Sequence, residues 1–397
     1  MIPIKKNLQT ILVIAGIFFI TACKKDQNAV PNITGTNILS GLPNSAITIT
    51  GNFFDTKLSD YTVTINGTPT IVNSVNASKL VVTVPAKVTA GKIIITVGSA
   101  TLTYPSAFKP ITETFTTSAY NTPQLQSVSA DAAGNIYGNY NNIIYKITPA
   151  GVTTTFATLN PGAGNFLAGN LVSDVAGNVF VVYYTSGSTN TVVSAGIYEI
   201  TPNGAVSILA GGGTPGTADG VGQAAQFMSP TGIAIDRFGN LYVNDAHRVR
   251  EVNRFGLVNT IAGNGTAGAI NGAASSATFG TLTAGIAVDT LGNVFVNDGN
   301  IREISATRTV TTFLNNNYNF TGTEMAVDVN DNIFLACNGT GGITSPKVIY
   351  MINTAGAASP VYTAGPFGGI VNIDQSGVMH IASGDQTNGW LVTGIFK

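Results

Sequence analysis

The chain has 397 residues, enough for more than one domain, and only 9% of them are Asp, Glu, Lys or Arg. The formal net charge of −1 gives no electrostatic basis for binding nucleic acid, and two cysteines provide no disulfide framework. Glycine is abundant at 46 residues, and long amphipathic helical patterns are missing. This composition favours β structure with many tight turns.

The N-terminal segment has the features of an export signal. Lys5 and Lys6 supply positive charge, and residues 11–20 (ILVIAGIFFI) form an apolar run too short to span a bilayer comfortably. Small residues then precede Cys23, an arrangement that resembles a bacterial lipobox. The resemblance implies acylation of Cys23. The alternatives are an ordinary signal peptide and a short anchor helix.

We therefore expect residues 1–22 to be a lipoprotein signal peptide and residues 23–30 to be a polar tether. The acyl chains on Cys23 would anchor the protein to a membrane of the cell envelope. We expect this to be the outer membrane, with the protein on either its periplasmic or its outer side.

Residues 31–110 alternate apolar and polar residues in short runs, such as 46–50 (AITIT) and 92–97 (KIIITV), separated by Gly-containing turns. Several short strands in about 80 residues suggest a small sandwich. The segments ITITGNFF at 47–54, VTINGTP at 63–69 and GKIIITVG at 91–98 resemble an IPT/TIG domain. This family has an immunoglobulin-like fold, and the resemblance implies a spacer or protein-interaction module.

The rest of the chain repeats one unit. DRFGNLYV at 236–243 has near copies at 131–138, 174–181 and 289–296, and looser ones at 328–335 and 374–381. A third and a fourth strand follow each copy, and four antiparallel strands every 40 to 60 residues make one propeller blade. IYEITPNG at 197–204 and the linker at 210–236 resemble NHL repeats. We expect an all-β chain, in which an Ig-like sandwich precedes a six-bladed NHL-type β-propeller over residues 111–397.

The sixth repeat stops after its third strand, GWLVTGIF at 389–396. Residues 111–118 (ITETFTTS) resemble the fourth strands of other repeats, such as VTTTFATL at 152–159. We therefore expect 111–118 to pair into blade six and close the ring, which would remove an open edge.

The repeated Asp has the character of a turn residue. Asp at the first position and Gly at the fourth suit a type I turn, in which the carboxylate accepts backbone N–H bonds. We expect the six Asp residues to lie far apart on the perimeter of one face, where they could not share a metal. In the last copy we expect His380 to occupy the apolar strand position of Val243.

The loops on the opposite face differ most between repeats, and ligand contacts concentrate in such loops. Aromatic and polar side chains there suit sugar rings by stacking and hydrogen bonding. The alternative is that the aromatics cap blade edges and the amides satisfy loop backbone. The candidate ligand-binding residues are Trp390, Tyr140, Tyr184, Tyr318, Asn244, Asp245, Asn297 and Asp298.

The sequence lacks the metal ligands that the enzymatic alternatives would need. Zinc needs three or four protein ligands, and only His247 and His380 are present. Lactonase-like propellers hold calcium with Glu, Asp and Asn near the axis, but no Glu accompanies Asp245 and Asp298. Cys337 fits a small buried residue. We expect no catalytic residue, metal site or cofactor, and a protein that binds a glycan or a protein. A metal-dependent lyase or lactonase-like hydrolase and a structural envelope protein are the alternatives.

Overall fold

The computed structural model describes residues 31–35, 39–41, 46–52, 57–110, 113–120, 123–160, 165–189, 191–315, 324–337, 348–354, 356, 358–363, 370–374, 378–384 and 389–396. These residues form strands and two short 3-10 helices, with no α-helix among them. No helix in this part of the chain is long and apolar enough to cross a membrane. The all-β fold class expected from the sequence is confirmed.

The first domain is a sandwich of two four-stranded sheets, in the orders β1-β3-β7-β6 and β5-β4-β8-β9. Fully buried residues of both sheets, including Ile49, Val63, Leu80 and Ile95, form its core. Strand β10 pairs with β2 in parallel. The elements are β1 (Asn32–Ile33), β2 (Ser40–Gly41), β3 (Ala46–Asn52), η1 (Leu58–Asp60), β4 (Tyr61–Ile65), β5 (Thr68–Pro69), β6 (Ile71–Val75), β7 (Lys79–Thr83), β8 (Ile93–Val97), β9 (Ala100–Thr103) and β10 (Lys109–Pro110).

The second domain contains antiparallel sheets built from consecutive strands. The first propeller sheet comprises β12 (Ser127–Ala130), β13 (Ile136–Tyr140), β14 (Ile143–Ile147) and β15 (Thr153–Thr158). The second comprises β16 (Asn165–Ser173), β17 (Val179–Ser186), β18 (Val192–Ile200) and β19 (Val206–Gly211). The third comprises β21 (Pro230–Ile235), β22 (Leu241–Asp245), β23 (Arg248–Val252) and β24 (Leu257–Ala262), with β20 (Gly220–Val221) added at its outer edge and η2 (Gly222–Ala224) following β20.

The fourth sheet has the same plan as the third. It comprises β26 (Ile286–Val288), β27 (Val294–Asn297), β28 (Ile301–Ile304) and β29 (Thr309–Leu314), with β25 (Gly272–Ala273) at its outer edge. The fifth comprises β30 (Met325–Val327), β31 (Ile333–Cys337), β32 (Val348–Ile352) and β33 (Ala358–Thr363). The sixth comprises β34 (Ile370–Ile373), β35 (Val378–Gly384), β36 (Gly389–Phe396) and β11 (Glu113–Tyr120).

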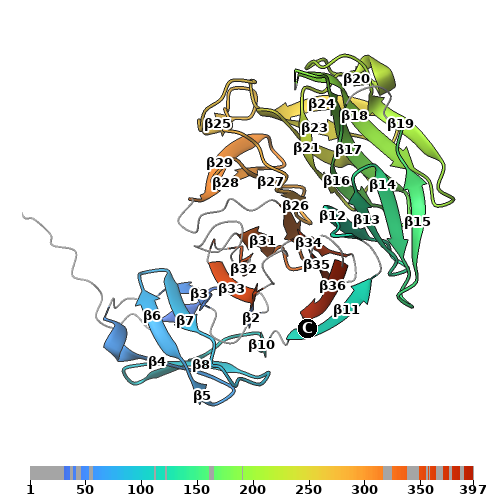
Figure 1. The fold of residues 1–397 in the computed structure, drawn as a ribbon. Helices are drawn as coiled ribbons and strands as arrows, with labels where there is room; N and C mark the ends of the chain where they lie inside the picture. The colour runs from blue at the N-terminus through green and yellow to red at the C-terminus, as the bar shows by residue number, and fades with distance from the viewer. Residues whose placement is uncertain are drawn as a thin grey trace, which may run out of the picture.

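The sheets are arranged around a common centre, where β12, β26 and β34 lie together (Figure 1). Each first strand contacts the first strand of the next sheet, from β12 through β16, β21, β26 and β30 to β34, and β34 contacts β12. Strand β11 pairs with β36 along its whole length, from Glu113 opposite Phe396 to Tyr120 opposite Gly389. The sixth sheet therefore contains β11, which precedes every other propeller strand in sequence.

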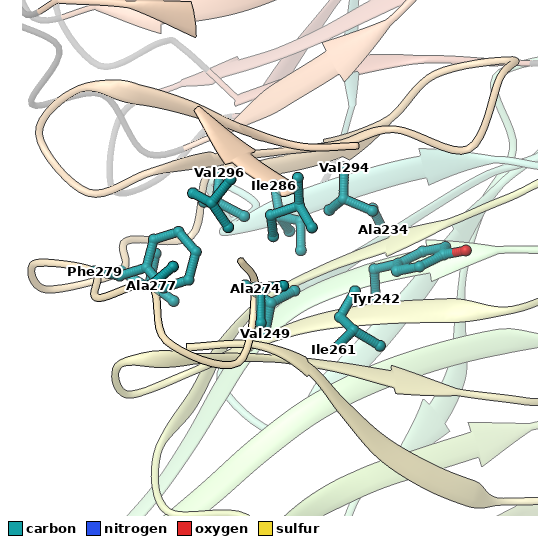
Figure 2. Packing of buried hydrophobic residues seen from close by; sticks show 14 residues of the cluster. Ala234, Tyr242, Val249, Ile261, Ala274, Ala277, Phe279, Ile286, Val294 and Val296 are labelled. Carbon is teal, nitrogen blue, oxygen red and sulfur yellow. The ribbon is translucent and has the colours of Figure 1, made fainter. Parts of the chain in front are cut away.

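Neighbouring sheets are held together by apolar side chains. Between the third and fourth sheets, Val249 and Ile261 of one sheet face Ile286, Val294 and Val296 of the other (Figure 2). All five are at most 8% exposed. Burying such side chains between neighbouring sheets stabilises their packing against each other.

The repeated Asp organises the turn between the first and second strands. Asp236 Oδ1 accepts the N–H groups of Phe238 and Asn240 at 2.8 and 2.9 Å, and its Oδ2 accepts the Asn240 amide at 2.9 Å. Asp131, Asp174, Asp289 and Asp328 make the same three types of bond. Gly239 has φ of +84°, the left-handed conformation that glycine adopts at no steric cost. The predicted turn is confirmed.

The position predicted for His380 is wrong. His380 pairs with Asn372 as Tyr137 pairs with Ser129, so it occupies the aromatic position of the repeat rather than that of Val243. Its Nε2 lies 3.0 Å from Asp374 Oδ2, as the Tyr137 hydroxyl lies 3.1 Å from Asp131 Oδ2. Val378 stands where the other repeats have the Asn of the turn. Because Val378 is apolar, it was matched to the first strand residue, which displaced His380 by one position.

Candidate functional site

A cavity of about 370 Å³ lies on the propeller axis, and the first strands of all six propeller sheets line it. Most of the wall is apolar, with Val128, Leu171, Ile233, Ile286 and Met325 each from a different sheet. Small-molecule sites are concave, mainly apolar and of roughly 300–1,000 Å³. The axial cavity is therefore the candidate ligand site.

At one end of the cavity, segments of different sheets approach closely. Asn170, on the second sheet, donates from Nδ2 to the carbonyl oxygen of Ala284, just before the fourth sheet, at 3.4 Å. A Cβ added to Gly232, on the third sheet between them, would lie 2.3 Å from the same carbonyl oxygen. Only glycine fits at that position, because any side chain would overlap backbone.

The other end of the cavity reaches the turns that follow the first strands. Arg237, Thr290 and Val329, which come directly after the turn Asp of their sheets, are part of its wall. Four turn Asp residues also line it, namely Asp236, Asp289, Asp328 and Asp374. The prediction that these residues lie on the perimeter is wrong, since the first strand is the innermost of each sheet and its end lies near the axis.

Two polar side chains of the cavity that do not belong to the turns come from the fifth and sixth repeats. Glu324 is 5% exposed and stands four residues before its turn Asp, where the third and fourth repeats have Gly232 and Gly285. Asn372 has a buried amide oxygen to which no described group donates a hydrogen bond. Glu324 and Asn372 thus place carboxyl and amide oxygens, which can accept hydrogen bonds, between apolar walls.

Other polar side chains of the wall are used within the protein. The hydroxyl groups of Ser127 and Ser129 accept the N–H groups of Leu171 and Ser173 at 3.0 and 2.9 Å, joining the first sheet to the second. Burial raises the pKa of Asp328, against hydrogen bonds from Asn332 that act to lower it. The wall of the cavity thus carries five carboxyl groups and Arg237, and its turn carboxyl groups are already hydrogen-bonded.

Two Asp residues predicted to bind ligand pair instead with buried arginines. Asp245 Oδ1 accepts the N–H groups of Met228 and Ser229, both at 2.8 Å, and its Oδ2 lies 2.9 Å from Arg250 Nη1. Asp298 Oδ2 lies 2.7 Å from Arg302 Nη1. Neither arginine has any exposed area. The sequence signal for this pair was the recurring Arg in VREV at 249–252 and IREI at 301–304.

The two predicted Asn residues are fully buried. Asn244 donates from Nδ2 to the carbonyl oxygens of Thr283 and Gly285 at 2.8 and 3.1 Å, which ties the third sheet to the start of the fourth. The Oδ1 of Asn297 accepts the N–H of Gly299 at 2.9 Å. Asn139, at the same repeat position, is also fully buried and donates to the Gly169 carbonyl at 3.4 Å. This position of the repeat therefore joins neighbouring segments of the protein.

Tyr140 and Tyr184 are half-buried at the ends of second strands, and neither lines the axial cavity. Tyr318, Cys23 and the side chain of Trp390 lie outside the described residues, so their proposed roles stay predictions. The backbone of Trp390 pairs with Ala119 in the sixth sheet. The two described tyrosines of the predicted aromatic set therefore lie apart from the cavity.

The residues considered for catalysis are separate. His247 Nδ1 lies 2.8 Å from the carbonyl oxygen of Gly280 on the following linker, whereas His380 contacts Asp374. Cys337 is 1% exposed, and burial raises the pKa of its thiol to about 12, which keeps it protonated and unreactive. Within the described residues, no three His, Cys, Asp or Glu side chains form a group able to hold a metal ion.

Two family models match the chain. Residues 31–110 match the IPT/TIG domain, and residues 120–271 match the Teneurin NHL domain. The chain combines an IPT/TIG domain with NHL repeats. Both resemblances expected from the sequence are thereby confirmed. No curated protein matches the chain.

Solved structures of similar fold have different activities. The gluconolactonase of Xanthomonas campestris is 10% identical, with 70% of this chain and 88% of its own covered and a TM-score of 0.50. An auxiliary nutrient binding protein from Bacteroides thetaiotaomicron is 12% identical, with 92% and 98% covered and a TM-score of 0.38. Virginiamycin B lyase from Staphylococcus aureus is 10% identical, with 71% and 99% covered and a TM-score of 0.45. At 10% identity the likeness to the gluconolactonase concerns the fold alone.

Proposed function

We propose that this protein is a non-catalytic binding protein of the cell envelope, anchored through acyl chains on Cys23. The IPT/TIG domain acts as a spacer, and the propeller binds a small hydroxyl-rich ligand, such as a sugar, in the axial cavity. The predicted site on the loop face, centred on Trp390, is the alternative location of the same function.

One observation carries the proposal: the axial cavity joins apolar walls to the acceptor oxygens of Glu324 and Asn372. Sugar hydroxyl groups donate hydrogen bonds to carboxylate and amide oxygens, while their C–H faces pack on apolar side chains. Its volume of about 370 Å³ suits one or two sugar rings.

Calorimetric titration with a panel of neutral mono- and disaccharides tests the location. We expect Glu324→Gln to weaken binding at least about tenfold, because hydrogen bonds to a charged group contribute about 1.5–3 kcal/mol. Ala326→Leu, which places a larger side chain in the cavity, should abolish binding. Glu303→Gln is the control, since this half-buried Glu does not line the cavity. Binding that survives both cavity changes but is lost in Trp390→Ala would place the site on the loop face.

The anchor has a separate test. Cells expressing the full chain are labelled with radioactive palmitate, and membrane and soluble fractions are compared with those of the Cys23→Ala variant. We expect label on the wild-type chain only and release of the variant from the membrane fraction. Equal fractionation without label would contradict acylation at Cys23.

A metal-dependent lyase or lactonase-like hydrolase is the second candidate, favoured by the carboxylates around the axis. Metal analysis of the purified chain separates it from the first. Stoichiometric zinc or calcium that resists chelation would support the enzyme. Absence of both metal and sugar binding would leave a structural role in the envelope.

A further inference from the structure

The turns after the first and third strands of the propeller sheets share one side of the propeller, here called the turn face. Thr290, in a turn of the fourth sheet, donates its N–H and hydroxyl to the Asp331 carboxylate in the matching turn of the fifth at 2.9 and 3.1 Å. Within the fourth sheet, the N–H of Ala306 in the second turn donates to Asn293 Oδ1 in the first at 3.0 Å. The turns are thus joined into one surface.

The tips of these turns carry exposed apolar side chains. Val175, Phe238, Leu291 and Val329 occupy the middle positions of four strand-one turns and are 60%, 71%, 73% and 62% exposed. Phe255, 71% exposed, occupies a third-to-fourth strand turn. The turn itself requires the Asp, Gly and Asn around these positions and sets no demand on the tip side chain. The fold therefore does not account for large apolar groups there.

The charged residues at the two middle positions of the described turns are both arginines, while the carboxylates of these turns are hydrogen-bonded within the protein. Arg237 and Arg254 are exposed, precede Phe238 and Phe255, and lie with their guanidinium carbons 4.7 Å from the ring centroids. The other described tip residues, two per turn, include no Asp or Glu. The two Arg–Phe pairs of the third sheet thus face solvent, and the neighbouring sheets carry apolar tips. This combination of positive charge and apolar groups complements an anionic partner.

The course of the chain gives the orientation of this face. Strand β11 starts opposite Phe396, the end of the third strand of its sheet, so the chain enters the propeller at the turn face. The chain therefore passes from the IPT/TIG domain into the propeller on this side. With acyl chains on Cys23, the tether and the IPT/TIG domain would connect the membrane to this face of the propeller.

We propose that the turn face docks on an anionic membrane surface. Phe238, Phe255 and Leu291 enter the boundary between head groups and acyl chains, and Arg237 and Arg254 contact lipid phosphates. A bilayer accommodates apolar tips that stand apart on separate sheets, whereas a protein partner would need a matching hollow for each. This inference goes beyond the proposed function and does not depend on sugar binding.

Quenching of a single tryptophan by bilayer-embedded quenchers tests the docking. The full chain carries Trp390→Phe to remove its only Trp, and Leu291→Trp to report from the turn face. It is reconstituted, without sugar, into vesicles of phosphatidylcholine with or without phosphatidylglycerol, both containing brominated phospholipid. We expect quenching to be at least about twofold stronger in the anionic vesicles. Adding Arg237→Gln and Arg254→Gln should remove that difference.

The matched control is Ile71→Trp in the same background, because Ile71 is 69% exposed on the first domain. Its indole should stay unquenched in both vesicles, which separates docking from simple attachment of the chain. An indole at position 291 that is unquenched in anionic vesicles overturns the proposal, as does quenching that is unchanged when Phe238→Ala and Phe255→Ala are added. Circular dichroism of each variant verifies that the fold is kept.

Discussion

The third and fourth propeller sheets differ from the fifth at one internal position. In the third, Asp245 ends the second strand, and in the fourth, Asp298 directly follows it; they pair with fully buried Arg250 and Arg302. In the fifth, the register places Cys337 at the Asp position and Tyr350 at the Arg position. The same point of the repeat is thus an ion pair in two sheets and has no ion pair in a third.

The difference between the sheets follows from the hydrogen bonds that the arginine makes. Arg250 also donates to the carbonyl oxygens of Gln226 and Ala218 and to the Asp219 carboxylate, all on the linker before its sheet. Arg302 donates to Thr278 and Ile270 in the same way. A buried arginine is costly unless it is paired and hydrogen-bonded, and here both Nη atoms of each arginine are used, whereas Nε has no partner among the described residues. The ion pair therefore occurs in sheets where the arginine also donates hydrogen bonds to carbonyl groups of the preceding linker.

The largest effect should come from the sixth sheet, which depends on a strand from the other end of the chain. Replacing residues 113–120 by eight Gly and Ser residues keeps the connection but removes β11 from its pairing with β36. We expect the thermal midpoint of the propeller to fall by about 10–20 °C, equal to roughly 5 kcal/mol. Calorimetry measures it, and an unchanged midpoint would mean that the ring does not need this strand.

The next effect tests the ion pair directly. Arg250→Met leaves Asp245 buried without its cation, and we expect a loss of about 3–5 kcal/mol in the free energy of unfolding. Urea unfolding followed by circular dichroism measures the loss. Arg254→Met, an exposed neighbour, should change stability by less than about 0.5 kcal/mol. Equal effects of the two variants would contradict the role assigned to Arg250.

Two carboxylates should respond to pH in opposite directions. Partial burial acts to raise the pKa of Asp219, but hydrogen bonds from Thr260 and Arg250 outweigh it and the pKa is lowered. Its contribution is present above the ordinary pKa of Asp and is lost as pH falls. Burial raises the pKa of Asp328, so its contribution is greatest in acid and declines as pH rises through the ordinary to the raised value.

Melting temperatures of Asp219→Asn and Asp328→Asn between pH 3 and 7 measure this. Relative to wild type, the deficit of Asp219→Asn should shrink toward acid pH, and that of Asp328→Asn should grow. Parallel curves for the two variants would show that their carboxyl groups do not have opposite pKa shifts.

The smallest effect concerns the sixth sheet, where Val378 replaces the Asn of the repeated turn sequence. His380→Tyr restores the residue found in the first and third sheets, where the hydroxyl bonds the turn Asp. We expect stability to change by less than about 1 kcal/mol at neutral pH. His380→Phe, which has no donor for Asp374, should cost more. Chemical unfolding distinguishes the two variants, and equal losses would show that the hydrogen bond contributes nothing.

Much of the fold was predictable because its determinants are local. The hydrogen bonds of the turn Asp join residues at most four positions apart, and alternating apolar residues mark the strands on either side. Where the turn departs from the pattern, at Val378, local reasoning misplaced His380. The buried arginines were overlooked because a charged residue in a strand pattern suggests solvent, and their partners lie up to 32 residues away.

The candidate site was less predictable. Glu324 differs from the Gly of the third and fourth repeats, a signal present in the sequence, but nothing local indicates that it faces an axial cavity. The turn Asp residues were expected on the perimeter, because sequence shows which strand a residue ends but not how far that strand lies from the axis.

By itself, the sequence determined the repeating unit, the turn chemistry and the order of the two domains, since each depends on contacts between residues close along the chain. Only the tertiary structure decided which strand is innermost, which side chains meet at the axis, and which arginines are buried. These depend on packing between sheets separated by 40 residues or more, where one short apolar strand looks like another until its neighbours surround it.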